Sequence, residues 1–192
     1  MVMNDRVPLN INQDKANRKT VNSKFIKIFH QNIRSLRNKT HALISHMHPD
    51  LPHVICLKEH HLNACEVGYV VIENYTIGAH YCRSNYQGGG AIIYVHNSLK
   101  FTNIDLSDYC NEKDIEICAI KISTNLQKIC IIAIYRAPSG NFTYFLRSLD
   151  NILKNLVSSS TCLIICGDLN VNYLLEKEQK CSYWITYYLC II

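Results

Sequence analysis

An amphipathic helix between two apolar strands constrains the fold of this chain more than any other feature. Residues 128–135 (KICIIAIY) and 161–166 (TCLIIC) are apolar runs with the length and composition of strands. Between them Asn141 is a candidate N-cap, and the apolar residues that follow recur at helical spacing: Phe142, Phe145, Leu146, Leu149, Ile152, Leu153 and Leu156. Such a stripe must pack on a sheet, so the segment predicts a βαβ-like unit.

The remaining elements are expected between residues 25 and 122. The run 53–58 (HVICLK) is typical of a strand buried on both faces, and further strands are expected at residues 25–30, 69–72, 75–81, 91–95 and 115–122. A helix is expected over residues 35–48, capped by Ser35, with one apolar face formed by Leu36, Leu43, Ile44 and Met47. This organisation predicts one domain over residues 25–175, preceded by a polar tail at 1–24 and followed by a divergent tail at 176–192.

The composition of the 192 residues favours an intracellular globular protein. The apolar fraction is 48%, and no run is long enough to cross a membrane or to serve as the core of a secretion signal. Of the ten cysteines, several lie inside apolar runs and are expected as small buried residues: Cys56, Cys118, Cys130, Cys162 and Cys166. No CxxC occurs, so a zinc site is not expected. We expect a nuclear or cytoplasmic protein that is neither secreted nor membrane-bound.

Most of the net charge of +5 comes from the basic residues of the first 27 positions. This excess is compatible with contact to a polyanion such as DNA. A solvated tail is the alternative interpretation of the same residues, and the sequence leaves both open.

Polar residues at the ends of two apolar strands are the candidate functional residues. Glu59 follows the run 53–58, while Asp168 and Asn170 follow the run 161–166 in the sequence GDLN. Carboxylate and amide oxygens in this pattern can bind Mg²⁺ or Mn²⁺ and orient a water for attack on a phosphate. The alternatives are an Asx turn at Asp168 and a simple solvent-exposed strand end at Glu59.

Three further residues are candidates because they lie at strand ends. Asn32 follows the first strand and could join the same cluster, although a loop asparagine is the alternative. Tyr135 ends the strand 128–135 and Arg136 follows it, so a phenol and a guanidinium could both donate to a phosphate, unless Tyr135 is simply a buried aromatic. His60 and His61 are adjacent, which places them on opposite sides of an extended chain and disfavours zinc.

The order of these segments resembles the endonuclease/exonuclease/phosphatase family. Five segments carry the resemblance, from residue 25 to residue 173: FHQNIRSLRNK, PHVICLKEHHL, GGGAIIYVHNSL, IAIYRAPSGNFTYFLRSLDNIL and LIICGDLNVNYL. Their wording is most similar to endonuclease domains of jockey-like non-LTR retrotransposons. The resemblance implies a four-layered α/β sandwich of two packed mixed sheets flanked by helices, which nicks DNA using a divalent metal. It also implies a reverse transcriptase domain and element RNA as partners in the intact element; we expect a monomer.

The resemblance assigns roles to the strand-end residues. Glu59 and Asn32 correspond to metal-binding residues, and Tyr135 corresponds to a tyrosine that contacts the scissile phosphate. Asp168 and Asn170 correspond to the pair that orients the attacking water and steadies the phosphate. With Arg136 beside Tyr135, these residues make the predicted site.

One segment of the family pattern is missing from the sequence. The family's last motif, of the Ser/Thr-x-x-Asp-His type, supplies a catalytic histidine, and no histidine follows His96. The expectation is a truncated sandwich that lacks its last strands and helix and is weak or inactive. The alternatives are a catalytically dead nucleic-acid-binding module and a chain that does not fold stably. The site alone also leaves open the branches that act on inositol lipids or sphingomyelin.

Overall fold

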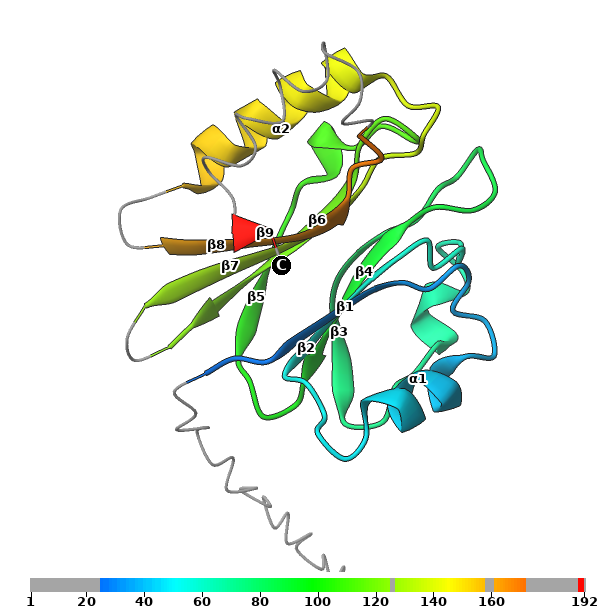
Figure 1. Cartoon of the computed structure of the whole chain (residues 1–192), viewed down its shortest axis with the longest axis vertical. Coiled ribbons are helices and arrows are strands. Elements are labelled where there is room, and N and C mark those ends of the chain that lie inside the picture. The colour runs from blue at the N-terminus through cyan, green and yellow to red at the C-terminus, as the bar shows by residue number, and fades with distance from the viewer. Residues whose placement is uncertain (1–24, 125–126, 158–160, 172–189, 192) are drawn as a thin grey trace, which may run out of the picture.

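Two β-sheets pack face to face, with one helix on the outer face of each (Figure 1). The computed structural model describes residues 25–124, 127–157, 161–171 and 190–191. The first sheet has the order β1-β2-β4-β3 and contains β1 (Ile28–Asn32), β2 (Val54–Lys58), β3 (Tyr75–Tyr81) and β4 (Ala91–His96). The second has the order β5-β6-β7-β8-β9 and contains β5 (Phe101–Ile104), β6 (Glu116–Ser123), β7 (Lys128–Tyr135), β8 (Thr161–Asp168) and β9 (Cys190–Ile191). With α1 (Thr40–Met47) and α2 (Phe142–Leu156) outside, the predicted four-layered α/β sandwich is confirmed.

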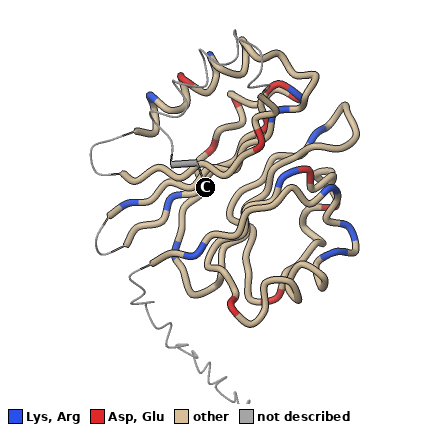
Figure 2. The backbone as a smooth tube through the Cα atoms, viewed as in Figure 1, with Lys and Arg blue, Asp and Glu red and all other residues tan. Residues whose placement is uncertain are grey.

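Period-two alternation along the strands explains the layers. In β2, Val54 and Cys56 join the core between the two sheets, whereas Ile55 and Leu57 join the core under α1. Every residue of β2 is buried, as predicted for a strand covered on both faces. The third core lies between the second sheet and the apolar face of α2. Most charged residues of the strands lie at a strand end: Lys58, Glu116, Lys128 and Asp168, whereas Lys121 lies inside β6. Figure 2 marks the charged positions along the whole tube.

The βαβ prediction is confirmed in detail. Strands β7 and β8 are parallel neighbours joined through α2, and their register ends with Tyr135 beside Asp168. Asn141 caps α2, because its side chain accepts a hydrogen bond from the backbone N–H of Tyr144 at 3.0 Å. The crossover therefore brings two predicted site residues to the same end of the sheet.

The structure corrects two predictions and adds a strand. Helix α1 begins at Thr40, and Ser35 does not cap it: Ser35 has φ 79° and its N–H donates to the Glu59 carbonyl at 2.7 Å. The strand expected at 69–72 is wrong. A 3-10 turn, η1 (Val67–Tyr69), begins the segment. The backbone N–H groups of Tyr69 and Val70 donate to the carbonyls of Glu66 and Val67, three residues earlier, and not to a neighbouring strand. Strand β5, which pairs with β6, was not predicted.

Several predictions lie partly or wholly outside the described residues. These are the tails at 1–24 and 176–192 and the end of the domain at 172–175. The eight described cysteines are free thiols, and Cys56, Cys118, Cys130 and Cys166 are buried as expected. Cys162, also expected to be buried, is only partly buried because it lies at the start of β8. Neither of the two described α-helices has the length and apolar character to cross a lipid bilayer.

Candidate active site

The layer between the sheets changes from apolar to polar at one edge, and the predicted residues lie there. Alternate residues of four strands face this layer, and each row ends in a polar side chain: Asn32 in β1, Lys58 in β2, Tyr135 in β7 and Asp168 in β8. Strands β1 and β2 are parallel, as are β7 and β8, so each pair places its carboxyl ends together. The topology of the two sheets thus gathers residues that are far apart in sequence.

Asn32 and Glu59 are in direct contact. The Asn32 amide donates from Nδ2 to Glu59 Oε1 at 2.6 Å. Asn32 Oδ1 is buried and has no hydrogen-bond partner among the described residues. The second carboxylate oxygen, Glu59 Oε2, lies 3.6 Å from His61 Nε2. One amide oxygen and one carboxylate therefore face the same space.

The backbone around Glu59 is held by the entrance to β4. Glu59 has φ 52°, and its N–H donates to the Gly90 carbonyl at 2.8 Å. Gly90 has φ 88°, and a Cβ at this position would lie 2.4 Å from His60 Nε2, so a side chain at 90 is excluded by both conformation and space. Gly90 thus allows close approach of the backbone to His60 at the start of β4.

Tyr135 lies next to Glu59, across the interface between the sheets. Its side chain is 6% exposed, and burial raises its pKa to about 12, with the Glu59 carboxylate and a hydrogen bond to it adding to the rise. At neutral pH the phenol is therefore protonated and acts as a hydrogen-bond donor. Tyr135 is both a buried aromatic and a member of the polar edge.

Asp168 lies at the polar edge and also forms the Asx turn that the sequence allowed as an alternative. Its Oδ1 accepts from the Asn170 N–H at 3.1 Å, and Asn170 has φ 47°. The Asn170 side chain donates to the Arg136 carbonyl at 2.6 Å. The turn fixes Asp168 at the end of β8, where its carboxylate interacts electrostatically with His30 and Lys58.

The buried side chain of Arg136 binds backbone carbonyls of the protein. Its side chain is 3% exposed and donates to the carbonyls of Leu169 at 2.7 Å, Gly140 at 2.7 Å and Asn170 at 2.5 Å. A guanidinium with this many backbone acceptors positions the turn after β8. Arg136 therefore positions this turn, and its contact with phosphate stays a prediction.

Sequence reasoning missed a buried ion pair at the same edge. Glu116, the first residue of β6, is fully buried, and its Oε1 lies 2.5 Å from Arg83 Nη2. The same carboxylate accepts from the N–H groups of Gly90 at 2.6 Å and Lys113 at 2.9 Å. A charged residue inside the apolar run IEICAIKI was the available signal, but nothing in the sequence marked Arg83 as its partner.

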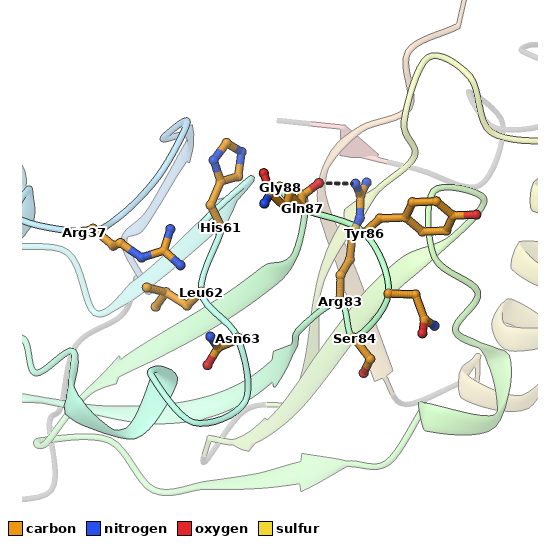
Figure 3. Close-up of a pocket in the computed structure, with 10 residues that line it drawn as sticks. Arg37, His61, Leu62, Asn63, Arg83, Ser84, Tyr86, Gln87 and Gly88 are labelled. Atoms are coloured by element: carbon orange, nitrogen blue, oxygen red, sulfur yellow. Dashed lines mark hydrogen bonds between the residues drawn. The ribbon is translucent and has the colours of Figure 1, made fainter.

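A groove of about 650 Å³ borders the polar edge. His61 and Arg37 lie on one side of it, and the loop with Arg83, Tyr86 and Gly88 lies on the other (Figure 3). Arg83 donates to the Gln87 carbonyl at 3.1 Å, which fixes the shape of this loop. His61, which lies 3.6 Å from Glu59, connects the groove with the polar edge.

Comparisons with known proteins identify the fold. No family model matches the chain, and no curated protein sequence matches it. Among solved structures, the chain is similar to the endonuclease domain of TRAS1, a telomere-specific non-LTR retrotransposon, with TM-score 0.63 and 12% identity over 85% of this chain and 70% of that one. An AP endonuclease from Archaeoglobus fulgidus has TM-score 0.64 and 17% identity over 85% and 70% of the two chains. D. rerio TDP2, complexed with single strand DNA product, has TM-score 0.57 and 15% identity over 82% and 64%.

The chain has the endonuclease/exonuclease/phosphatase fold. At these identities the similarity establishes the architecture that the resemblance implied. One of the similar structures is itself a retrotransposon endonuclease domain, which is the branch that the motif wording favours. Both the TRAS1 domain and the A. fulgidus protein are endonucleases.

Proposed function

We propose that this chain is a DNA-nicking endonuclease domain of retrotransposon type that hydrolyses phosphodiester bonds with a divalent metal. The observation that carries the proposal is the convergence of Asn32, Glu59, Tyr135 and Asp168 at one polar edge between the sheets. In an intact element, the partners would be DNA, a reverse transcriptase domain and the element's RNA.

The residues at this edge fit Mg²⁺ or Mn²⁺. Asn32 Oδ1 is a buried acceptor without a partner among the described residues, and its amide nitrogen already donates to Glu59. Hard cations prefer such oxygen ligands and complete their coordination with water and phosphate. The described residues contain no cluster of three or more His, Cys, Asp and Glu side chains that could hold a metal ion. When bound, the ion would stabilise negative charge on the phosphate.

The side chains have separable roles in the proposed reaction. Asp168 lies at the end of β8 with one oxygen held by the Asn170 N–H, so its other oxygen can orient a water and accept its proton. The protonated phenol of Tyr135 can donate to a phosphate oxygen. Asn170 is held by the Arg136 carbonyl and can steady the phosphate from the same turn. Arg136 keeps this turn in place.

Nicking of supercoiled plasmid in the presence of Mg²⁺ tests the proposal. We expect weak nicking by the wild type, because the histidine of the family's last motif is absent from the sequence. This nicking should stop on adding EDTA and fall further, by roughly a thousandfold or more, in Asp168→Ala. Asp150→Ala is the matched control, because Asp150 is an exposed carboxylate on α2 that pairs with Lys154 at 2.6 Å. Absence of nicking by the wild type would refute the endonuclease proposal, and DNA binding without nicking would favour a binding module. Full activity in Asp168→Ala would refute the assignment of the base.

A further inference from the structure

Lys58 is a buried lysine at the polar edge that has no role in the reaction proposed above. It is the last residue of β2 and follows Val54 and Cys56 in the row that faces the second sheet. Its side chain is 3% exposed. A lysine at such a depth is uncommon, because burial costs the ammonium its hydration.

The Lys58 ammonium makes no hydrogen bond within the described part of the chain. Its favourable interactions are electrostatic: the largest is with Asp168 on the opposite sheet, followed by Cys166 and then by Glu59 beside it. Burial lowers the pKa of Lys58, and these two carboxylates act in the opposite direction. An ammonium carries three N–H donors, and those of Lys58 remain available to a ligand.

The other buried cations at this edge are already bound to protein groups. Arg83 is paired with Glu116, and Arg136 donates to three backbone carbonyls. His30, on β1, has a pKa lowered to about 4 by burial and by Lys58, so it is uncharged at neutral pH. Lys58 differs from Arg83 and Arg136 in that no described protein group accepts a hydrogen bond from its side chain.

Two buried polar atoms of β1 near Lys58 also have no hydrogen-bond partner among the described residues. Asn32 is the register partner of Lys58, and its buried Oδ1 has no hydrogen-bond partner among the described residues. His30 lies two residues before Asn32 on the same face of β1, and its Nε2 is likewise buried without a partner among the described residues. Buried polar atoms in proteins are nearly always satisfied, so these two unsatisfied atoms beside the Lys58 ammonium indicate a site.

We propose that the Lys58 ammonium binds a phosphate oxygen of the nucleic-acid substrate between Glu59 and Asp168. The inference rests on the proposed function, which supplies a phosphodiester as the anion. A tetrahedral oxyanion matches the ammonium because it offers several acceptors together with the opposite charge. Lys58 would then be a catalytic residue in the strict sense of touching the substrate.

The salt dependence of DNA binding tests this contact. Binding of a short DNA duplex is measured by fluorescence anisotropy in EDTA, so that no hydrolysis competes. We expect the slope of log K against log salt to fall in magnitude by about 0.9 in Lys58→Met, the change for one lost phosphate contact. Lys154→Met is the matched control and is expected to keep the wild-type slope, because Lys154 lies on the outer helix and pairs with Asp150. An unchanged slope and affinity in Lys58→Met would overturn the proposal.

A measurement on the unmutated protein protects the test against misfolding of the variant. The side-chain ¹⁵N resonance of Lys58 is followed while inorganic phosphate is added, and a saturable shift is expected. A resonance that does not move with phosphate, in protein that binds duplex, would also overturn the contact. Competition by inorganic phosphate against the duplex then separates a general phosphate site from one that needs a nucleic-acid backbone.

The two proposals can fail independently. Lys58-dependent phosphate binding without nicking in Mg²⁺ would refute the endonuclease activity and leave the contact standing. Nicking with binding that is indifferent to Lys58 would refute the contact alone.

Discussion

Loss of Arg83 is the perturbation whose consequence the structure defines most closely. Arg83 follows β3 in the first sheet and Glu116 begins β6 in the second, so their ion pair joins the sheets at the polar edge. The Arg83 side chain is 8% exposed and that of Glu116 is 0% exposed. Arg83→Met would therefore leave a buried carboxylate without its cation.

The magnitude follows from the donors that remain. Breaking a buried pair from one side costs about 3–5 kcal/mol. Glu116 would keep the N–H groups of Gly90 and Lys113, which places the expected loss near the lower limit, about 3 kcal/mol. For a domain of this size, each kcal/mol lowers the melting temperature by about 2–4 °C, so Arg83→Met should melt roughly 6–12 °C below wild type.

The same substitution should also reduce nicking. Glu116 holds the Gly90 N–H at 2.6 Å, and the Gly90 carbonyl in turn accepts from the Glu59 N–H at 2.8 Å. A loosened Gly90 therefore displaces the backbone of the proposed metal ligand. Because misplacement of a catalytic group lowers the rate, the loss of nicking should persist at temperatures where the variant is fully folded.

Thermal and urea melts followed by circular dichroism measure the effect, with a double-mutant cycle to isolate it. Arg83→Met combined with Glu116→Gln should be less destabilised than the sum of the single variants, because no buried charge is left unpaired. Arg37→Met is the control, since Arg37 pairs with Glu66 by a similar geometry in an exposed position and should melt close to wild type. A change of less than about 2 °C in Arg83→Met would refute the reasoning.

Three further predictions concern the supports of the fold and of the site. Asn141→Ala should destabilise by about 1 kcal/mol in a urea melt, because the N-cap bond to Tyr144 is lost. Arg136→Met should cost about 3 kcal/mol or more, because three backbone carbonyls lose a charged donor, and hydrogen exchange at Asn170 should become faster. His60 should make unfolding pH-dependent. Its Nδ1 accepts from the Leu62 N–H and burial lowers its pKa to about 4, so the unfolded state binds the proton first. Stability should therefore fall by about 3 kcal/mol as pH drops from about 6.5 to about 4, and His60→Gln should show a smaller decline.

The βαβ unit could be predicted from the sequence because its signals are local. The strand at 128–135 agrees with β7, and the cap at Asn141 and the apolar stripe agree with α2. Each of these features depends on residues within a few positions of one another. The residues at the strand ends were found in the same way, since an apolar run marks where its strand must end.

The failed predictions depended on contacts between distant segments. Ser35 has the chemistry of an N-cap, but its backbone pairs with Glu59 instead, and the helix starts five residues later. The strand expected at 69–72 has β-branched residues but no neighbouring strand to pair with. The acceptors of Arg136 come from the turn after β8, at Leu169, and from the loop before α2, at Gly140, so its positioning role was not predicted. Local patterns do not contain this information.

The position of the polar edge follows from topology more than from any one motif. Parallel pairing brings the ends of β1 and β2 together in one sheet and those of β7 and β8 together in the other. Because the rows that fill the core run to the ends of these strands, the last residue of each row lies where the apolar layer meets solvent. Polar side chains are tolerated there and face one another across the two sheets. Glu59 and Asp168 are far apart in the sequence but lie at one site, because both parallel strand pairs have their carboxyl ends at the same edge of the sandwich.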